Sequence, residues 1–183
     1  MASALSKTTI RLHWIVAITM IFLCIVGFYM TNWHDYGYYD LHKAIGVLIL
    51  LVVVPRVIWR IKMGWPKPLG KDSPLLHVIA MLVHWVLIVS TLSMPVFGLL
   101  MSAVGGHGVD IFGWQMIDTH FAPGTHDAVP YSPFWAEVGE QGHEINGYLL
   151  MGTIVLHVLG ALKHHIIDKD GTLRRMLGHS IES

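Results

Sequence analysis

The chain has 183 residues, of which 54% are hydrophobic and 13% charged, and its formal net charge at pH 7 is zero. A soluble domain would carry about 25% charged residues, so this composition and the mean hydropathy of +0.55 indicate an integral membrane protein. The zero net charge argues against nucleic acid as a partner. The single cysteine, Cys24, excludes an internal disulfide and any metal cluster built from several cysteines.

The first apolar segment covers about residues 9–31, just after Lys7 and Arg11. Its uncharged run from Leu12 to His34 is longer than the roughly 7–15 apolar residues of a secretory signal, and no typical cleavage site follows it. A membrane-spanning helix needs about 20 residues. We therefore interpret this segment as a retained first span.

The second apolar segment, about residues 41–62, is less regular. Only residues 44–55 lie between Lys43 and Arg56, too few to cross about 30 Å of hydrocarbon. Long basic side chains reach the membrane surface from inside a span, so the helix is predicted to continue past both residues. Pro55 is predicted to kink it unless a neighbouring helix compensates for the lost hydrogen bond.

The third span is predicted at about residues 75–101, where no residue is charged, and the fourth at about 143–166. The segment 102–142 between them is rich in glycine and proline and is predicted to be mostly loop. Within it, "VDIFGWQMI" and "FWAEV" are predicted to lie in the membrane interface, where tryptophan is favoured. The whole chain, residues 1–183, is thus predicted to be a single all-α transmembrane domain of four helices.

The basic residues predict the orientation of these spans. Every lysine and arginine except Lys43 falls on the side that holds both termini and the connection between the second and third spans. Because basic residues are retained in the cytoplasm, both termini are predicted to be cytoplasmic and residues 102–142 external.

The chain has 13 histidines, and an imidazole inside a bilayer needs a polar partner. His143 and His157 share one face of the fourth span and lie about 21 Å apart along its axis at 1.5 Å per residue. His13 in the first span is expected at the depth of His157. His42, at the start of the second span, is expected at the depth of His143.

Two imidazoles at each of two depths form the arrangement that holds two haem irons in the core of a helix bundle. A single histidine in a span is more often a hydrogen-bond donor to a neighbouring helix, and metal passage or a proton relay are further alternatives. We call the haem on the cytoplasmic side, at His13 and His157, the inner haem and the other the outer haem. His84, on the cytoplasmic half of the third span, could compete for the inner haem.

Three basic residues lie near these depths. Arg56 and Arg60 are one helical turn apart near the inner haem, and Lys43 is adjacent to His42. Each could pair with a haem propionate, or each could simply mark a membrane boundary.

Four motifs in chain order resemble the bacterial cytochrome b561 family: "RLHW", "LHKAIGVLILLVVVPRVIWRI", "HWVLIVSTLSMPVFGLLM" and "HVLGALKHHIIDKDGTLRRML". The resemblance implies a di-haem b-type cytochrome of the bacterial inner membrane, a four-helix bundle enclosing two b haems. The axial positions of the family match His13, His42, His143 and His157. His84 matches a histidine that the family carries but does not use as an axial ligand.

The resemblance also implies a function. Iron held by two histidines has no open coordination position, which favours one-electron transfer. The family exchanges electrons between the quinone pool and a small periplasmic redox partner, and some members look like superoxide:ubiquinone oxidoreductases. We therefore expect an oxidoreductase, surrounded by membrane lipid, that oxidises superoxide and reduces ubiquinone or another quinone.

The expected quinone site lies at the cytoplasmic end, near His164, His77 and Lys71, although His164 could instead merely reach the membrane surface. Two other functions remain open. Similar cytochromes serve as quinone-linked haem b anchor subunits of hydrogenases and formate dehydrogenases. A histidine-lined transporter is less favoured, because no span shows the interrupted pattern of transporter helices.

Overall fold

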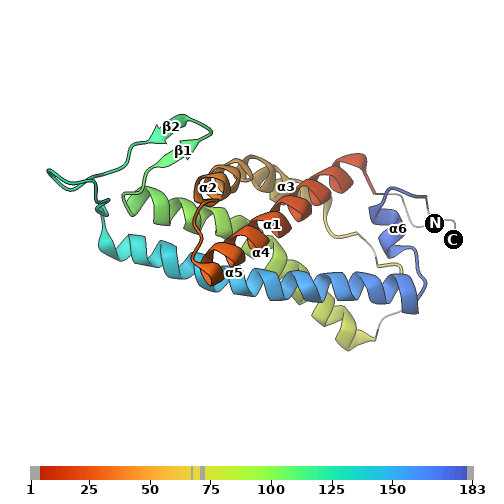
Figure 1. The fold of residues 1–183 in the computed structure, drawn as a ribbon. Coiled ribbons are helices and arrows are strands. Elements are labelled where there is room, and N and C mark those ends of the chain that lie inside the picture. The colour runs from red at the N-terminus through yellow and green to blue at the C-terminus, as the bar shows by residue number, and fades with distance from the viewer. Residues whose placement is uncertain (1–4, 67, 71–72, 181–183) are drawn as a thin grey trace.

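The computed structural model describes residues 5–66, 68–70 and 73–180, and its architecture is mostly helical (Figure 1). The helices and strands in chain order are α1 (Lys7–Trp33), α2 (Tyr39–Leu48), α3 (Leu50–Met63), α4 (Pro74–Val104), β1 (Val109–Ile111), β2 (Trp114–Ile117), α5 (Pro133–Leu162), a π-helix (Lys163–Ile167) and α6 (Thr172–Met176).

Four helical segments are long and apolar enough to cross a membrane: Lys7–Trp33, Tyr39–Met63, Pro74–Val104 and Pro133–Ile167. Large apolar side chains on them, such as Ile18, Leu51 and Ile61, are exposed and point away from the bundle. Apolar outer surfaces are expected for helices surrounded by lipid. The predicted all-α membrane fold is therefore confirmed.

The second span is divided into α2 and α3, and the irregularity lies at Ile49 rather than at Pro55. The carbonyl of Ile49 accepts hydrogen bonds from the amides of both Val52 (3.0 Å) and Val53 (2.8 Å). A proline crowds the carbonyl four residues before it and cannot bond to that carbonyl, so its effect falls in the preceding turn. Pro55 itself lies inside α3, and the interruption of the second span falls nearer the start of the span, at Ile49.

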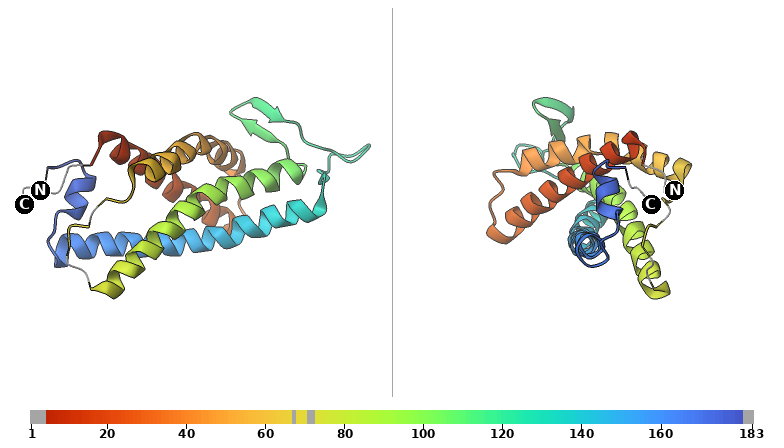
Figure 2. Two further views of the ribbon diagram at one scale, coloured as in Figure 1. Left: turned by 180° about the vertical axis from the view of Figure 1, so that it is seen from behind. Right: turned by 90° about the vertical axis from the view of Figure 1, so that its right-hand side faces the viewer.

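Helices α4 and α5 run side by side along most of their length, as the two views of Figure 2 show. Between them Asn146 donates hydrogen bonds to the carbonyl of Ser90 (3.1 Å) and the hydroxyl of Ser93 (3.0 Å). Helices α1, α2 and α3 pack across this pair. The buried apolar core that joins them consists of Val16, Met20, Leu23, Ile49, Val53 and Leu150.

The segment expected to be mostly loop contains regular structure. Strands β1 and β2 form an antiparallel hairpin from "VDIFGWQMI", and α5 begins at Pro133, well before the predicted start at about 143. Proline is favoured in the first turn of a helix. The hydropathy pattern did not predict these turns because they carry Glu137 and Glu140 and extend beyond the apolar part of the helix.

After Leu162 the chain widens into a π-helix and then turns back to form α6. The indole of Trp14 in α1 donates a hydrogen bond of 2.9 Å to the carbonyl of Met176 in α6. The start of α1 and α6 therefore lie at one end of the bundle (Figure 1). We call this the inner end, and the end that carries the hairpin the outer end.

We predict that Gly139→Ala destabilises the contact between α4 and α5. A Cβ at Gly139 would lie 2.5 Å from the amide nitrogen of Met101 and 2.9 Å from its Cα, so the two helix backbones must separate. Overpacking of this kind costs about 1–3 kcal/mol. Thermal unfolding of the purified protein in detergent should show a lower midpoint for this variant.

Gly152→Ala is the matched control, because a Cβ at Gly152 would meet nothing within 4 Å. Alanine is the better helix former, so this variant should unfold at the same or a higher temperature. Equal midpoints for the two variants would contradict the close approach at Gly139.

Candidate haem-binding site

The structure brings two pairs of histidines together inside the bundle. At the outer end the rings of His42 and His143, from α2 and α5, have centroids 6.1 Å apart. At the inner end the rings of His13 and His157, from α1 and α5, have centroids 6.2 Å apart. We call these the outer pair and the inner pair. Helix α5 contributes one member to each.

The outer pair is oriented by the backbone and by two glycines. His143 donates a hydrogen bond from Nδ1 to the carbonyl of Met94 (3.0 Å), which directs its other nitrogen away from α4. A Cβ at Gly98 would lie 3.1 Å from the His143 ring, and one at Gly27 would lie 3.2 Å from the His42 ring. Helices α4 and α1 thus support the rings through positions that only glycine leaves open.

The Nδ1 atom of His42 is buried and has no hydrogen-bond partner among the described residues. A buried polar atom without a partner costs free energy, so such an atom indicates a missing ligand or a functional constraint. A cavity of about 30 Å³ adjoins both rings of the outer pair and is otherwise mostly apolar. It is lined by Met20, Leu23, Cys24, His42, Gly46, Ile49, Met94, Pro95, His143 and Leu150. Its volume is that of about one water, so it marks the space beside the rings and not the outline of a macrocycle.

The inner end holds a third imidazole. The ring of His84, from α4, lies 5.2 Å from that of His157 and nearly perpendicular to it. His84 also hydrogen-bonds the carbonyl of Ala80 one turn earlier in its own helix, which occupies one of its ring nitrogens. The separation of His13 and His157, rather than that of His84 and His157, matches the separation within the outer pair.

Two arginines of α3 lie beside the inner pair. Arg56 is half-buried and close enough to His13, His84 and His157 to interact with each electrostatically. No carboxylate of the described residues pairs with Arg56, and Arg60 is a like-charged neighbour. A partly buried cation without an anion is unfavourable, so this position suits an anionic group of a ligand.

Arg60 interacts with neighbouring groups of the protein. Its Nη1 donates to the carbonyl of Gly64 (3.1 Å), and its guanidinium lies 5.4 Å from the ring of Trp65. Trp65 in turn contacts His84, with ring centroids 5.7 Å apart. Sequence reasoning missed Trp65, because it follows the end of α3 and no spacing rule relates it to α4.

Lys43 lies at the outer end, next to His42. Its ammonium donates a hydrogen bond of 3.4 Å to the carbonyl of Gly108, just before β1, and lies 4.9 Å above the ring of Tyr39. Lys43 therefore joins α2 to the segment between α4 and β1.

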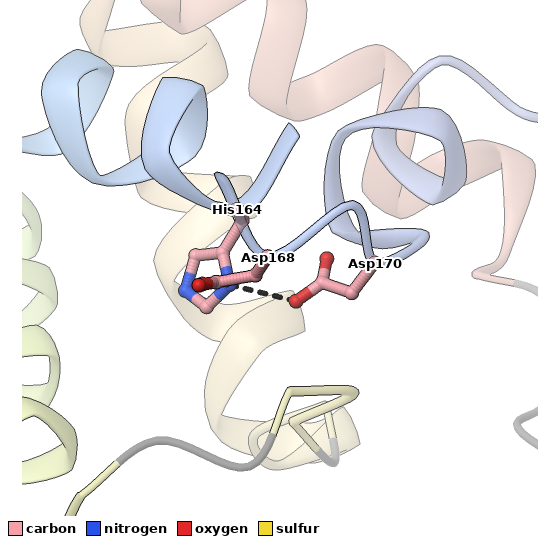
Figure 3. Close-up of side chains that lie close together, drawn as sticks. All are labelled: His164, Asp168 and Asp170. Atoms are coloured by element: carbon pink, nitrogen blue, oxygen red, sulfur yellow. Dashed lines mark hydrogen bonds and ion pairs between the residues drawn. The ribbon is translucent and has the colours of Figure 1, made fainter. Parts of the chain in front are cut away.

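The residues expected near a quinone lie at the inner end but do not form one apolar slot. His164 donates from Nδ1 to the carboxylate of Asp170 (2.7 Å), with Asp168 at 3.2 Å (Figure 3). Lys163 forms an ion pair of 2.6 Å with Asp168. His77 is exposed at the start of α4. Lys71, like Lys67, lies outside the described residues.

A cavity of about 440 Å³ adjoins this carboxylate cluster. Its lining is partly polar and consists of Leu69, Gly70, Ser73, Leu76, Lys163, Asp168 and Asp170. His164 stands beside it rather than in its lining. The chain is α-helical from His157 to Leu162 and π-helical over residues 163–167, so the angle per residue changes just before His164.

Burial alone would raise the pKa of Asp170, but hydrogen bonds from Thr172 and His164 outweigh burial and lower this pKa overall. The Asp170 carboxylate accepts a bond of 2.8 Å from the amide of Thr172, at the start of α6. Asp170 therefore closes the turn before α6 and joins this turn to His164 of the π-helix.

Comparison with known proteins relates the whole chain to one family. The family model described as prokaryotic cytochrome b561 matches residues 4–179. The chain is 34% identical to cytochrome b561 homolog 2 of Escherichia coli (strain K12) over 92% of this chain and 88% of that relative. It is 26% identical to the probable superoxide oxidase CybB of Yersinia pestis, over 92% of each. Cytochrome b561 homolog 1 of Escherichia coli (strain K12) is 27% identical over 94% of this chain and 96% of that relative.

We predict that Asp170→Ala loosens α6. Loss of a hydrogen bond such as the one from the Thr172 amide costs about 1 kcal/mol, which is roughly a fivefold change in an opening equilibrium. Amide hydrogen exchange in residues 172–176 should therefore accelerate several-fold, as measured by mass spectrometry. Asp168→Ala is the control, because an exposed ion pair contributes little.

The stability that Asp170 gives to α6 should depend on pH, and the pKa shift fixes the direction of this dependence. Because the pKa of Asp170 is lowered on folding, the ionised carboxylate stabilises the folded state. This stabilisation is complete above the ordinary aspartate pKa of about 4. The contribution should be lost as the pH falls through the lowered pKa of the folded state. Equal exchange in Asp170→Ala and in the wild type would contradict the role of Asp170 in holding the start of α6.

Proposed function

Because this chain belongs to the prokaryotic cytochrome b561 family, we propose that it carries single electrons across the membrane between superoxide and a quinone. Members of this family are haem b-binding membrane cytochromes, and this chain has the four apolar helices of such a protein. The proposal of electron transfer through two haems rests on the outer and inner pairs of histidines, whose ring centroids are separated by nearly equal distances, 6.1 and 6.2 Å.

We assign one haem b to each couple, so that the chain binds two. A bond between a metal and an imidazole nitrogen is about 2 Å long. Each nitrogen lies about 1 Å from the centre of its ring, so two imidazoles on opposite sides of one metal have centroids about 6 Å apart. His42 and His143, and likewise His13 and His157, have this separation. His42 and His143 would therefore hold one haem b, and His13 and His157 would hold the other.

A bis-histidine haem supplies one-electron redox chemistry at an iron with no open position. The protein supplies orientation, charge and exclusion of water. The Met94 carbonyl fixes the His143 ring by its hydrogen bond. Arg56 offers its positive charge to a propionate at the inner level. Buried apolar residues such as Val53 and Leu150 separate the two levels from water.

Superoxide is the proposed external donor for two reasons. The relative in Yersinia pestis carries the name of a superoxide oxidase. At the outer end Lys43 is the only lysine or arginine, since residues 102–142 contain none, and it lies next to His42. A lone ammonium at that position attracts an anion. The proposed orientation places this end in the periplasm of a bacterial inner membrane and both termini in the cytoplasm.

The stoichiometry of the proposed reaction balances. Each superoxide that becomes dioxygen gives up one electron, and the reduction of one quinone to quinol takes two electrons and two protons. Two superoxide ions are therefore oxidised per quinone. We propose that the quinone, ubiquinone or a related one, is reduced at the inner end near His164 and His77. His164 and the carboxylates of Asp168 and Asp170 form a group through which protons can reach it.

The ligand assignment predicts two separable losses. His42→Ala or His143→Ala should remove the outer haem and spare the inner one, and His13→Ala or His157→Ala should do the reverse. Haem extraction with iron analysis should show half of the wild-type content in each variant, and the lost half should differ in its redox midpoint between the two groups. His84→Ala should retain both haems. If His84→Ala empties the inner site and His13→Ala does not, the inner ligands are His84 and His157.

The function is tested by stopped-flow absorbance of the haems in proteoliposomes. Superoxide should reduce them, and added ubiquinone should then reoxidise them. Quinol-dependent reduction without any response to superoxide would leave the cytochrome assignment in place and overturn the donor.

His164→Ala should slow the quinone step several-fold, because one lost hydrogen bond costs about 1 kcal/mol, and it should leave the haem spectrum intact. His165→Ala, at the exposed neighbouring position, is the control. An unchanged quinone step in His164→Ala would place the quinone site elsewhere.

A further inference from the structure

The β1–β2 hairpin at the outer end has one face held firmly on the bundle. Val109 and Ile111 are buried, Val109 with 1% of its surface exposed, and they pack against Ala44 of α2. The carbonyl of Gly108, just before β1, accepts the hydrogen bond from Lys43. The position of the hairpin relative to α2 is therefore fixed by side chains of both elements.

The turn of the hairpin presents aromatic residues away from the bundle. Ile111 pairs with Trp114 across a two-residue turn, and the turn residues Phe112 and Gly113 have φ angles of 51° and 89°. Such a turn favours asparagine or glycine at both positions, because a side chain in the left-handed region is strained. Phe112 is nevertheless 66% exposed, and Trp114 next to it is 67% exposed. Neither packing nor turn geometry explains an exposed phenylalanine at this position.

The hairpin folds back toward the membrane-spanning part of the molecule. In Figures 1 and 2 it lies over the outer end of α2, whereas the connection from β2 to α5 extends outward beyond it. At the same end, Trp33 at the end of α1 and Tyr36 and Tyr38 in the connection to α2 are also exposed. The outer end therefore exposes aromatic side chains from two separate segments, the hairpin and the chain from the end of α1 to α2.

The chemistry of this surface matches the headgroup region of a bilayer. Tryptophan and other aromatic residues are enriched at that depth. The hairpin carries no lysine or arginine. Its one acid, Asp110, accepts a hydrogen bond of 2.9 Å from the amide of Gly113 and so closes the turn. The remaining outward surface, from Phe112, Trp114 and Met116, is mainly apolar.

We propose that Phe112 and Trp114 insert into the headgroup region of the membrane leaflet on the side of His42 and His143. The hairpin is then an interfacial anchor that holds β1, and with it the Gly108 carbonyl, against α2 and Lys43. This proposal depends on membrane insertion of the four spans and is independent of the electron donor and acceptor.

The test is the accessibility of a nitroxide label in proteoliposomes of the full haem-loaded protein. Phe112→Cys and, separately, Trp114→Cys are labelled in a Cys24→Ser background, and relaxation by oxygen and by a water-soluble nickel chelate is compared. Oxygen concentrates in lipid and the chelate stays in water. We expect both labels to be reached several-fold better by oxygen relative to the chelate than a label at the control position Thr125→Cys.

Thr125 is exposed in the connection between β2 and α5, which extends away from the bundle. If the label at Phe112 or Trp114 is as accessible to the chelate as the one at Thr125, the tip is in water and the proposal is wrong. If both reagents are excluded, the tip is covered by protein, such as a second copy of this chain, and the proposal is again wrong. Two label positions guard against a single variant that fails to fold.

Discussion

An imidazole in an apolar helix bundle must find partners for its nitrogens, and this requirement sets how closely the helices approach. His143 meets it on one side by donating to the Met94 carbonyl of α4. His42 has a buried nitrogen that no described residue satisfies. A buried nitrogen of this kind indicates a missing ligand or a functional constraint. Close approach of α1 to the His42 ring at Gly27, and of α4 to the His143 ring at Gly98, limits how far the two rings can move.

Helix α5 makes the two levels parts of one structure. It carries a member of each couple, and its contact with α4 is fixed by the Asn146 hydrogen bonds and by the absence of a side chain at Gly139. The other members, His13 and His42, come from different helices that cross the α4–α5 pair. A shift of α1 or α2 would therefore change one couple and leave the other unchanged, because α5 is the shared reference.

Sequence reasoning succeeded where the helices are regular and failed where they are not. Depth along an axis follows from 1.5 Å per residue, so the partners of His143 and His157 could be chosen from sequence, and the structure brings those residues together. The rule could not anticipate the π-helix at residues 163–167, which changes the angle per residue close to His164. It also could not rank His84 against His13, since depth does not show which face of a helix meets its neighbour.

The early start of α5 and the β1–β2 hairpin were missed for a different reason. A hydropathy pattern reports what lies in lipid, whereas these elements are stabilised by turn chemistry and by contact with α2. The two-residue turn was hard to recognise because its first position holds Phe112 instead of asparagine or glycine. Phe112, the residue that made the turn hard to recognise in the sequence, is also the exposed residue that supports lipid contact.

The two ends of the bundle differ in charge before any cofactor is considered. Arg56 and Arg60 both lie beside the inner couple, and Arg56 has no carboxylate partner among the described residues. At the outer end Lys43 is the single cation, and its ammonium is already shared with the Gly108 carbonyl and the Tyr39 ring. An anionic group bound at the inner level is therefore stabilised more strongly than one at the outer level. The outer cation depends in turn on the hairpin, because the Gly108 carbonyl reaches Lys43 only while β1 stays packed on α2.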